Sequence, residues 1–400
     1  MYEPYSVKYC KLMARLATFR RFSDFEYVKT VAAVDALANR AMDLYRGAKQ
    51  EKYSGIPEID PDGIFERAES YVDALERGEY PLLGIFAEIG GGIGDHCFIE
   101  KDGVMHVFYI RHVIGYGWGE RYCDALGHAW STDLFHWHYE QPALTISADK
   151  FDNFQVWAPA VVEKEGKYYM FYTGVNREIS QTICLAFSDD LFVWKKYEEN
   201  PVFVPGNWSP WREDKWSACR DPMVFGDGKG TWYMYYCAQE RTDGGTMQDT
   251  PADGTHPNNC PIFTDIPVKN VVAVASSTDL IHWKDEGPIR IKGVEDTAES
   301  PFVFCHEGTC FLLSAGSGKI FVSDGDMVGG WKPYDNNGIS VVQGCSEVFS
   351  YKGRWFISSA GWKAMGSLFA QEQYLQIREL FWQKDGSMIA GPYLCAPIDV

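Results

Sequence analysis

The chain has 400 residues, of which 15% are aromatic, and a formal net charge of −18 at pH 7. Its length exceeds that of a usual compact domain, and its acidity argues against nucleic acid and anionic membranes as partners. No apolar stretch is long enough to cross a bilayer, and the N-terminus lacks a basic region followed by an apolar one. We therefore expect a cytoplasmic protein. A secreted protein whose leader has been removed is the alternative.

The N-terminal part is expected to be helical. A capping box begins at Ser23 and is followed by apolar side chains with a helical period, up to Gly47. A second helix is expected from Pro61 to Gly78, with apolar residues along one side. Such a stripe must be buried, either against the rest of the chain or in a homodimer.

From about residue 90 the sequence changes to short aromatic strands separated by Gly and Asp. Five similar strand starts recur, at residues 94–99, 157–162, 220–225, 299–304 and 345–349. Repeats of this length indicate a solenoid or a propeller, and in a propeller equivalent strand starts meet at the central axis. We predict an all-β fold, a five-bladed β-propeller of four-stranded antiparallel blades. The predicted domains are a helical extension over residues 1–85 and the propeller over residues 86–400.

A second signature, Ser-x-Asp-Leu-x-x-Trp, follows the strand starts. It occurs at residues 131–137, 188–194 and 277–283, with a degenerate copy from Ser323 to Trp331. Because the signature recurs in nearly every repeat, we interpret its Asp and Trp residues as structural. They are expected to form the turn between the outer two strands of each blade.

Two connecting segments are unusually long. Residues 239–270 are rich in Gly, Asp, Thr and Pro, which predicts a lid or rim loop. Residues 207–216 contain three tryptophans and lead into the third strand start. Indole faces suit the apolar side of a sugar ring, and packing between blades is the alternative for each of the three.

Three of the five strand starts carry a carboxylate that would face the axis, namely Asp95, Asp221 and Glu299. Cleavage of a glycosidic bond needs one carboxylic acid to protonate the departing oxygen and one carboxylate to attack the anomeric carbon or activate water. Glu299 suits the acid, because it lies beside an apolar strand and follows two other acidic residues. Asp95 is predicted to be the nucleophile or base, and Asp221, next to Arg220, to remain ionised and stabilise positive charge.

Other residues near these strand starts are predicted to contact the substrate. They are His96, Trp157, Trp216, Arg220 and Glu347. The eleven cysteines lack zinc-type spacing, and those within expected strands, such as Cys237 and Cys310, are expected to be free thiols that pack as small apolar side chains. Neither a phosphate-binding glycine loop nor a serine nucleophile elbow is present, and we expect no metal and no cofactor.

Several of these segments resemble known glycosidases. Residues 127–137, 181–190 and 220–225 resemble glycoside hydrolase family 32, the invertases, levanases and inulinases. Residues 157–159 and 299–304 resemble family 43, the arabinofuranosidases and xylosidases. The resemblance extends over residues 90–395 and implies a five-bladed propeller whose Asp, Asp and Glu act together, in this chain order.

The resemblance also implies roles for individual residues. Asp95 would be the nucleophile as in family 32 or the general base as in family 43, Asp221 the transition-state stabiliser or pKa tuner, and Glu299 the acid. The family 32 motif Trp-Met-Asn-Asp-Pro-Asn is absent, and Gly94-Asp95-His96-Cys97 stands in its place. At the fifth strand start, Glu347 occurs where family 43 often has a histidine.

The expected function is a glycosidase that removes a terminal furanosyl unit, fructofuranosyl or arabinofuranosyl, from a small oligosaccharide. The alternatives are a carbohydrate-binding propeller that has lost catalysis, and a transglycosylase or xylosidase on the same scaffold. Stereochemistry, linkage and oligomeric state are not specified by these motifs.

Overall fold

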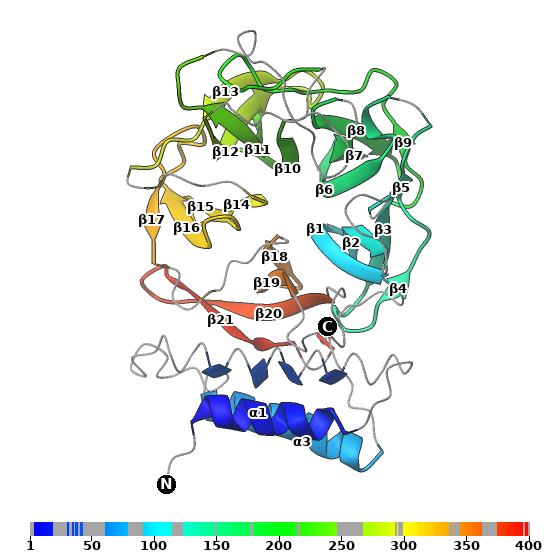
Figure 1. The fold of residues 1–400 in the computed structure, drawn as a ribbon, viewed down its shortest axis with the longest axis vertical. Coiled ribbons are helices and arrows are strands. Elements are labelled where there is room, and N and C mark those ends of the chain that lie inside the picture. Colours follow the sequence, from blue (N-terminus) through cyan, green and yellow to red (C-terminus); the bar gives the residue numbers. More distant parts are fainter. Residues whose placement is uncertain are drawn as a thin grey trace.

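The computed structural model is a ring of five β-sheets with helices on one side (Figure 1). The described residues are 4–18, 30–31, 34–35, 37–38, 41–42, 61–78, 91–113, 123–148, 150–176, 179–213, 217–245, 267–292, 294, 299–335, 339, 345–361, 374–394 and 397–398. Within each sheet the strands follow one another in chain order and pair antiparallel. This arrangement confirms the predicted five-bladed propeller.

The first strand of each blade lies nearest the centre of the ring, and the last lies toward the outside (Figure 1). Blade one contains β1 (Gly91–Lys101), β2 (Val104–Val113), β3 (Ala125–Ser131) and β4 (His138–Tyr139), with β5 (Leu144–Thr145) also paired to β3. After the short 3₁₀ helix η3 (Lys150–Asp152), blade two contains β6 (Gln155–Lys164), β7 (Lys167–Val175), β8 (Thr182–Ser188) and β9 (Lys195–Lys196).

The other three blades repeat this order. Blade three contains β10 (Cys219–Gly226), β11 (Trp232–Arg241), β12 (Val268–Ser277) and β13 (Lys284–Pro288). Blade four contains β14 (Pro301–His306), β15 (Thr309–Ser314), β16 (Lys319–Ser323) and β17 (Lys332–Tyr334). Blade five contains β18 (Val348–Tyr351), β19 (Arg354–Gly361), β20 (Tyr374–Trp382) and β21 (Met388–Tyr393).

The core lies between the faces of neighbouring blades. Strands in the middle of a blade are buried on both faces, which is why β7 and β8 read as nearly continuous apolar runs. Phe171 packs with Met234 and Tyr236 between blades two and three, while Tyr172, the next residue, packs with Phe108 between blades one and two. Alternate side chains therefore join opposite neighbours, and the ring is held together by aromatic packing.

The repeated Ser-x-Asp-Leu-x-x-Trp signature forms the predicted turn between the third and fourth strands. In blade two, Asp190 Oδ1 accepts hydrogen bonds from the backbone N–H groups of Phe192 and Val193, both at 2.8 Å. Leu191 adopts a positive φ of 74°, and its carbonyl accepts a hydrogen bond from Trp194 Nε1 at 3.0 Å. These residues therefore form a turn, as their recurrence indicated.

Within the described residues, blades five and one share no strand and are joined by side-chain and terminal contacts. His96 Nε2 lies 2.7 Å from Ser358 Oγ, and the backbone N–H of Phe98 donates to Glu347 Oε2 at 3.0 Å. Near the C-terminus, the N–H of Ile398 donates to the carbonyl of Asp133 at 3.1 Å. These polar contacts close the ring together with the stacking of Phe98 of blade one on Phe349 of blade five.

The helical extension lies beside blade five (Figure 1). Helices α1 (Tyr5–Leu16) and α3 (Pro61–Glu76) pack together with apolar residues of the 31–42 segment and with Ile389 of β21. The second predicted helix is confirmed from Pro61, and the predicted stripe packs within the chain. The capping box and the domain boundary near residue 85 lie outside the described residues, and the domain division and the homodimer both remain predictions.

One cysteine expectation is wrong. Cys310 is not a free thiol: it forms a disulfide with Cys305, directly opposite it in the β14–β15 pair. Adjacent antiparallel strands bring the two side chains to the same face, a relation that sequence spacing alone does not reveal. Cys97, Cys184 and Cys237 are free and buried, as predicted.

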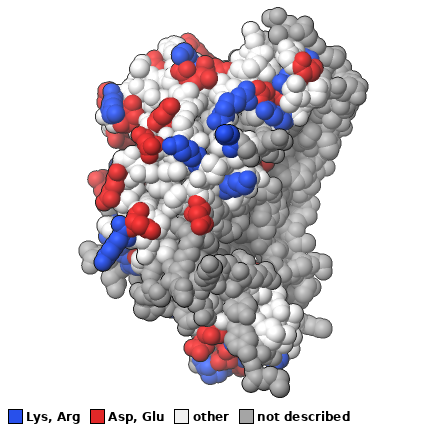
Figure 2. Space-filling view, turned by 90° about the vertical axis from the view of Figure 1, so that its left-hand side faces the viewer, with Lys and Arg blue, Asp and Glu red and all other residues white. Residues whose placement is uncertain are grey.

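Basic and acidic side chains are interspersed over the described surface shown in Figure 2. Several of the surface charges are paired, including Arg290 with Glu240 and Arg354 with Glu379. None of the described helices is long and apolar enough to span a membrane.

Candidate active site

Backbone irregularities at the inner ends of the first strands position the predicted site. The pairing register shifts between Ile93 and His96 in β1, between Trp157 and Ala160 in β6, and between Arg220 and Met223 in β10. Such a bulge re-aims the side chains at the end of a strand. Three of the five strand starts, in β1, β6 and β10, are therefore bulges, whereas the described pairings of β14 and β18 are regular. β-Bulges are over-represented next to active sites.

The three carboxylates do not occupy equivalent positions, contrary to our expectation. Asp221 (φ 55°) and Ser300 (φ 40°) share the left-handed conformation immediately before a proline, so Glu299 corresponds to Arg220. In β1 the irregular residues are Gly94 and Asp95, which places Asp95 one position after the residue that matches Asp221. Pro222 and Pro301 already carried the offset between Asp221 and Glu299 in the sequence, and aligning on them would have revealed it. The Asp95 segment has no proline, so its offset became visible only in the strand pairing.

A network of short contacts nevertheless joins the carboxylates from three blades. Ser300 Oγ donates a hydrogen bond to Asp95 Oδ2 at 2.8 Å, and the backbone N–H of Ser300 donates to Asp221 Oδ2 at 3.2 Å. Arg220 completes the network, because Nε lies 3.4 Å from Asp221 Oδ2 and Nη2 lies 3.5 Å from Glu299 Oε2. Asp95, Asp221, Glu299 and Arg220 are therefore brought together, as the propeller geometry predicted.

Two further residues hold the backbone of this cluster. The N–H of Asp221 donates to Thr173 Oγ1 of blade two at 3.0 Å, and the N–H of Glu299 donates to Cys237 Sγ of blade three at 3.0 Å. Asp221 is 6% exposed, whereas the Glu299 side chain is 40% exposed. No sequence pattern pointed to Thr173 or Cys237, since both lie on second strands of neighbouring blades.

Burial and mutual repulsion control the ionisation of the two aspartates. The pKa of Asp95 is raised well above its usual range by burial and by the neighbouring charge of Asp221, while Ser300 and Arg220 oppose the shift. Burial also raises the pKa of Asp221, and the Arg220 guanidinium counteracts it. Asp221 was predicted to remain ionised beside Arg220. In the structure Arg220 does lower the pKa of Asp221, but burial raises that pKa by more.

Glu347 lies at the start of blade five, beside the cluster. It is 7% exposed and accepts the Phe98 N–H bond described above. Burial raises the pKa of Glu347 well above its usual range, and the charge of Asp95 adds to the effect. The predicted fourth carboxylate is therefore close enough to Asp95 to interact with it electrostatically, although its hydrogen bond serves the contact between blades.

The other predicted substrate contacts fall into different environments. Trp157 is half-buried at the inner end of β6 and donates from Nε1 to Gln155 Oε1 at 2.8 Å. His96 is 1% exposed and is bonded to Ser358, which favours a structural role over the predicted substrate contact. Trp216 lies outside the described residues.

The tryptophan segment before β10 packs mostly inside the protein. Trp211 is 8% exposed and donates to the carbonyl of Gln181 at 2.7 Å, while Trp208 donates to Asp285 at 2.7 Å. Both therefore follow the packing alternative. Most of the predicted rim loop, residues 246–266, lies outside the described part of the chain.

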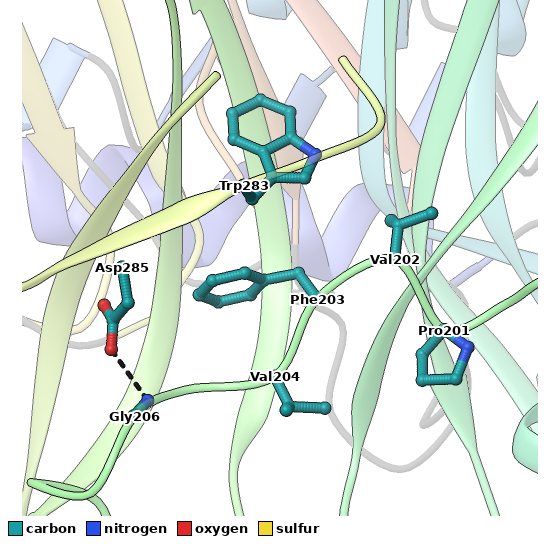
Figure 3. A pocket seen from close by; sticks show the side chains of 7 residues that line it. All are labelled: Pro201, Val202, Phe203, Val204, Gly206, Trp283 and Asp285. Carbon is teal, nitrogen blue, oxygen red and sulfur yellow. Dashed lines mark hydrogen bonds between the residues drawn. The ribbon is translucent and has the colours of Figure 1, made fainter. Parts of the chain in front are cut away.

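A cavity of about 290 Å³ lies away from this cluster, between the 201–206 segment and the end of blade three (Figure 3). Its one carboxylate, Asp285, accepts hydrogen bonds from Gly206 N, Trp208 Nε1, Tyr236 OH and Gly287 N, at 2.7 to 3.0 Å. With each oxygen already accepting two bonds, this carboxylate is committed to structure. Elsewhere in the described residues, no group of three or more His, Cys, Asp or Glu side chains is arranged to hold a metal.

Comparisons with known proteins agree with this fold. Residues 96–248 match the family model for the "Glycosyl hydrolases family 32 N-terminal domain". The structure of sucrose-6-phosphate hydrolase from Lactobacillus gasseri superposes with a TM-score of 0.55 and 16% identity, covering 88% of this chain and 69% of that one. A family 43 β-xylosidase/α-arabinofuranosidase from a compost metagenome gives 0.53 and 15%, covering 77% and 96%.

The chain is thus a five-bladed β-propeller that resembles glycoside hydrolases of families 32 and 43, as its motifs indicated. Among curated proteins, vacuolar acid β-fructofuranosidase 1 of a Rosa hybrid cultivar is 37% identical over 109 residues, 26% of this chain and 18% of that protein. Sucrose-6-phosphate hydrolase of Bacillus subtilis is 28% identical over 228 residues, 54% of this chain and 39% of that protein. The matched segments therefore span well under half of these relatives.

Proposed function

We propose that this protein is a glycoside hydrolase that releases a terminal fructofuranosyl unit from a small oligosaccharide. The observation that carries the proposal is the contact network linking Asp95, Asp221 and Glu299 from three different blades. Three acidic side chains at a single point are costly unless something stabilises them, and perturbed carboxylates gathered in this way are typical of functional sites. The family 32 match supports the reaction type.

Each carboxylate has a chemically distinct environment. The Glu299 side chain is 40% exposed, whereas Asp221 is buried, and Glu299 is the proposed acid, reaching the departing oxygen from the open side. Asp95 is the proposed nucleophile or base, and both roles use its anion, which the hydrogen bond from Ser300 and the charge of Arg220 favour against burial. Asp221, held by Arg220 and Ser300, would stabilise the positive charge that develops at the anomeric centre.

Fructofuranosides are favoured over arabinofuranosides as substrates. The curated relatives matched by sequence include the β-fructofuranosidase and the sucrose-6-phosphate hydrolase, and a raffinose invertase of Escherichia coli is 27% identical over 179 residues. The arabinofuranosidase similarity rests on fold alone, at 15% identity. Because the matched parts of the relatives are short, the sugar and the leaving group are both part of the proposal.

The test is hydrolysis by the full chain of sucrose, raffinose, fructo-oligosaccharides, and nitrophenyl fructofuranoside and arabinofuranoside. We expect Glu299→Gln to reduce turnover of sucrose by about 10²- to 10⁴-fold, because the acid is lost. The same variant should lose much less on a nitrophenyl substrate, whose leaving group departs without protonation. Asp95→Asn should lose activity on both, and exposed Asp189→Asn should lose it on neither.

The products separate the remaining alternatives. Reaction in aqueous methanol traps a methyl fructoside whose anomeric configuration shows whether Asp95 attacks the sugar or activates water. Transfer of the sugar to a second saccharide in preference to water would indicate a transglycosylase. A parent protein that binds these sugars without cleaving any would refute the hydrolase proposal and indicate a binding propeller.

A further inference from the structure

Ser300 contacts two of the three carboxylates at once. Its hydroxyl bonds to Asp95 Oδ2 at 2.8 Å, and its backbone N–H bonds to Asp221 Oδ2 at 3.2 Å. The residue is 5% exposed and immediately follows Glu299 in the chain. One residue therefore contacts Asp95 of blade one and Asp221 of blade three, and is covalently joined to the proposed acid.

We propose that Ser300 is a positioning residue that fixes Asp95 relative to Asp221 and Glu299 and supports Asp95 as an anion. The inference deepens the proposed function and rests on it for its catalytic part. An ionised carboxylate only accepts hydrogen bonds, so the serine O–H must donate to Asp95 when that residue is charged. Hydrogen bonds to a charged partner are the stronger kind, which suits a group that must hold its orientation.

The electrostatics of the cluster explain why such a donor matters. Burial and the charge of Asp221 raise the pKa of Asp95. The hydrogen bond from the Ser300 hydroxyl is the largest influence that lowers it. Arg220 lies closer to the other two carboxylates, contacting Asp221 and Glu299 directly. Ser300 is therefore the described residue whose hydrogen bond directly favours the anion of Asp95.

The backbone conformation of Ser300 limits what can replace it. Its φ of 40° lies in the left-handed region, where a β-branched residue is strongly disfavoured. The matching position in β6 is Ala158 (φ 45°), which shows that this backbone conformation before a proline does not require a hydroxyl. The hydroxyl of Ser300 is thus separable from the local fold, and the two can be tested independently.

The experiment compares Ser300→Ala and Ser300→Gly with the parent protein. Both variants remove the hydroxyl and keep the backbone N–H to Asp221, and glycine also accepts the positive φ without strain. The control is Ser346→Ala, a serine that is 1% exposed at the fifth strand start, and whose hydroxyl has no hydrogen-bond partner among the described residues. Circular dichroism and thermal unfolding establish that each variant is folded.

On the fructofuranoside that the parent cleaves best, we expect kcat to fall about tenfold in both Ser300 variants, with KM little changed. The acidic limb of the kcat/KM profile should move up by about one pH unit, because the anion of Asp95 loses its donor. Ser346→Ala should leave the acidic limb of the kcat/KM profile at the same pH as in the parent protein. An unmoved acidic limb in folded Ser300→Gly would overturn the inference.

A measurement without substrate keeps the two proposals separate. The carboxyl ¹³C signal of Asp95, assigned by its loss in Asp95→Asn, is followed by NMR as a function of pH. Its midpoint should rise by about one unit in Ser300→Ala and Ser300→Gly, even if no furanoside is cleaved. A parent without hydrolytic activity would refute the proposed function alone, whereas an unchanged midpoint would refute the role of Ser300.

Discussion

At the scale of single residues, the environment of each carboxylate depends on a few contacts from other blades. Glu299 and Asp221 differ in exposure by a wide margin, although both sit at strand starts with nearly the same local sequence pattern. Arg220 and Ser300 supply the donors that allow acidic side chains to lie close together. The chemistry of the site is thus set by neighbours that are distant in sequence.

Gly94, which precedes Asp95, is required by close packing. A Cβ at this position would lie 2.7 Å from His112 Nε2 and 3.0 Å from Ile110 Cβ. We predict that Gly94→Ala destabilises the protein by about 1–3 kcal/mol through overpacking and lowers kcat/KM by displacing Asp95. Urea unfolding and the fructofuranoside assay measure both effects.

The control for this change is Gly329→Ala in the outer turn of blade four. There an added Cβ would meet only the tip of the Asp326 side chain, at 3.2 Å, which can move aside. Equal stability losses in the two alanine variants would contradict the packing argument.

At the scale of secondary-structure elements, the outer turn of each blade is a local structure built from its own residues. The signature positions a Ser and an Asp so that they cap the turn, and this pattern is visible in the sequence because every partner lies within three residues. Even the degenerate copy keeps the principle, since Asp326 accepts the N–H groups of Val328 and Gly329. Local hydrogen bonds of this kind are what sequence patterns predict best.

Two adjacent aspartates in blade two allow a matched test of this turn. Both side chains are exposed, but Asp190 accepts three hydrogen bonds, from Ser188, Phe192 and Val193, whereas Asp189 accepts none from the described residues. Asp190→Ala is expected to lower the free energy of unfolding by about 1–2 kcal/mol, as loss of a helix cap does. Asp189→Ala should change it by less than about 0.5 kcal/mol. Chemical denaturation measures the free energy of unfolding of both variants. Similar losses in the two would argue against the capping role of Asp190.

At the scale of the whole molecule, the ring brings buried histidines into the contacts between strands and blades. Burial lowers the pKa of His96 to about 4, and the same cause lowers the pKa of His106 and His112 to about 4 and of His128 to about 3. An unfolded histidine titrates near pH 6.5. Each of these residues therefore favours unfolding as the pH falls from about 6.5 toward 4, because only the unfolded chain takes up the proton.

His96, at the contact between blades five and one, gives a direct test. The raised pKa values of Asp95 and Glu347 act with the opposite sign, so variants must be compared with the parent. Between pH 7 and pH 5, the parent should lose about 2 kcal/mol more unfolding free energy than His96→Asn, whose amide can still bond to Ser358. An identical pH dependence in His96→Asn would show that His96 takes up its proton equally in both states.

How much of the fold could be predicted depends on how far apart in the sequence the interacting residues lie. The repeated strand starts, the outer turns and the helix from Pro61 depend on local patterns, and the structure agrees with them. The disulfide between Cys305 and Cys310, the inward position of His96 and the packing of Trp211 depend on which strands become neighbours. These features were misjudged or left open because no local pattern encodes them.

The sequence by itself determined that five similar units form a ring with acidic residues at its centre, because repetition and turn chemistry are local and additive. Only the tertiary structure decided how those acids meet. Relative to the place that Asp221 holds in its strand start, Glu299 lies one position earlier and Asp95 one position later, and Ser300 and Arg220 bridge the three across blades. Contacts of this kind depend on the closure of the ring, which brings Asp95 to Ser300 across 205 positions of the sequence.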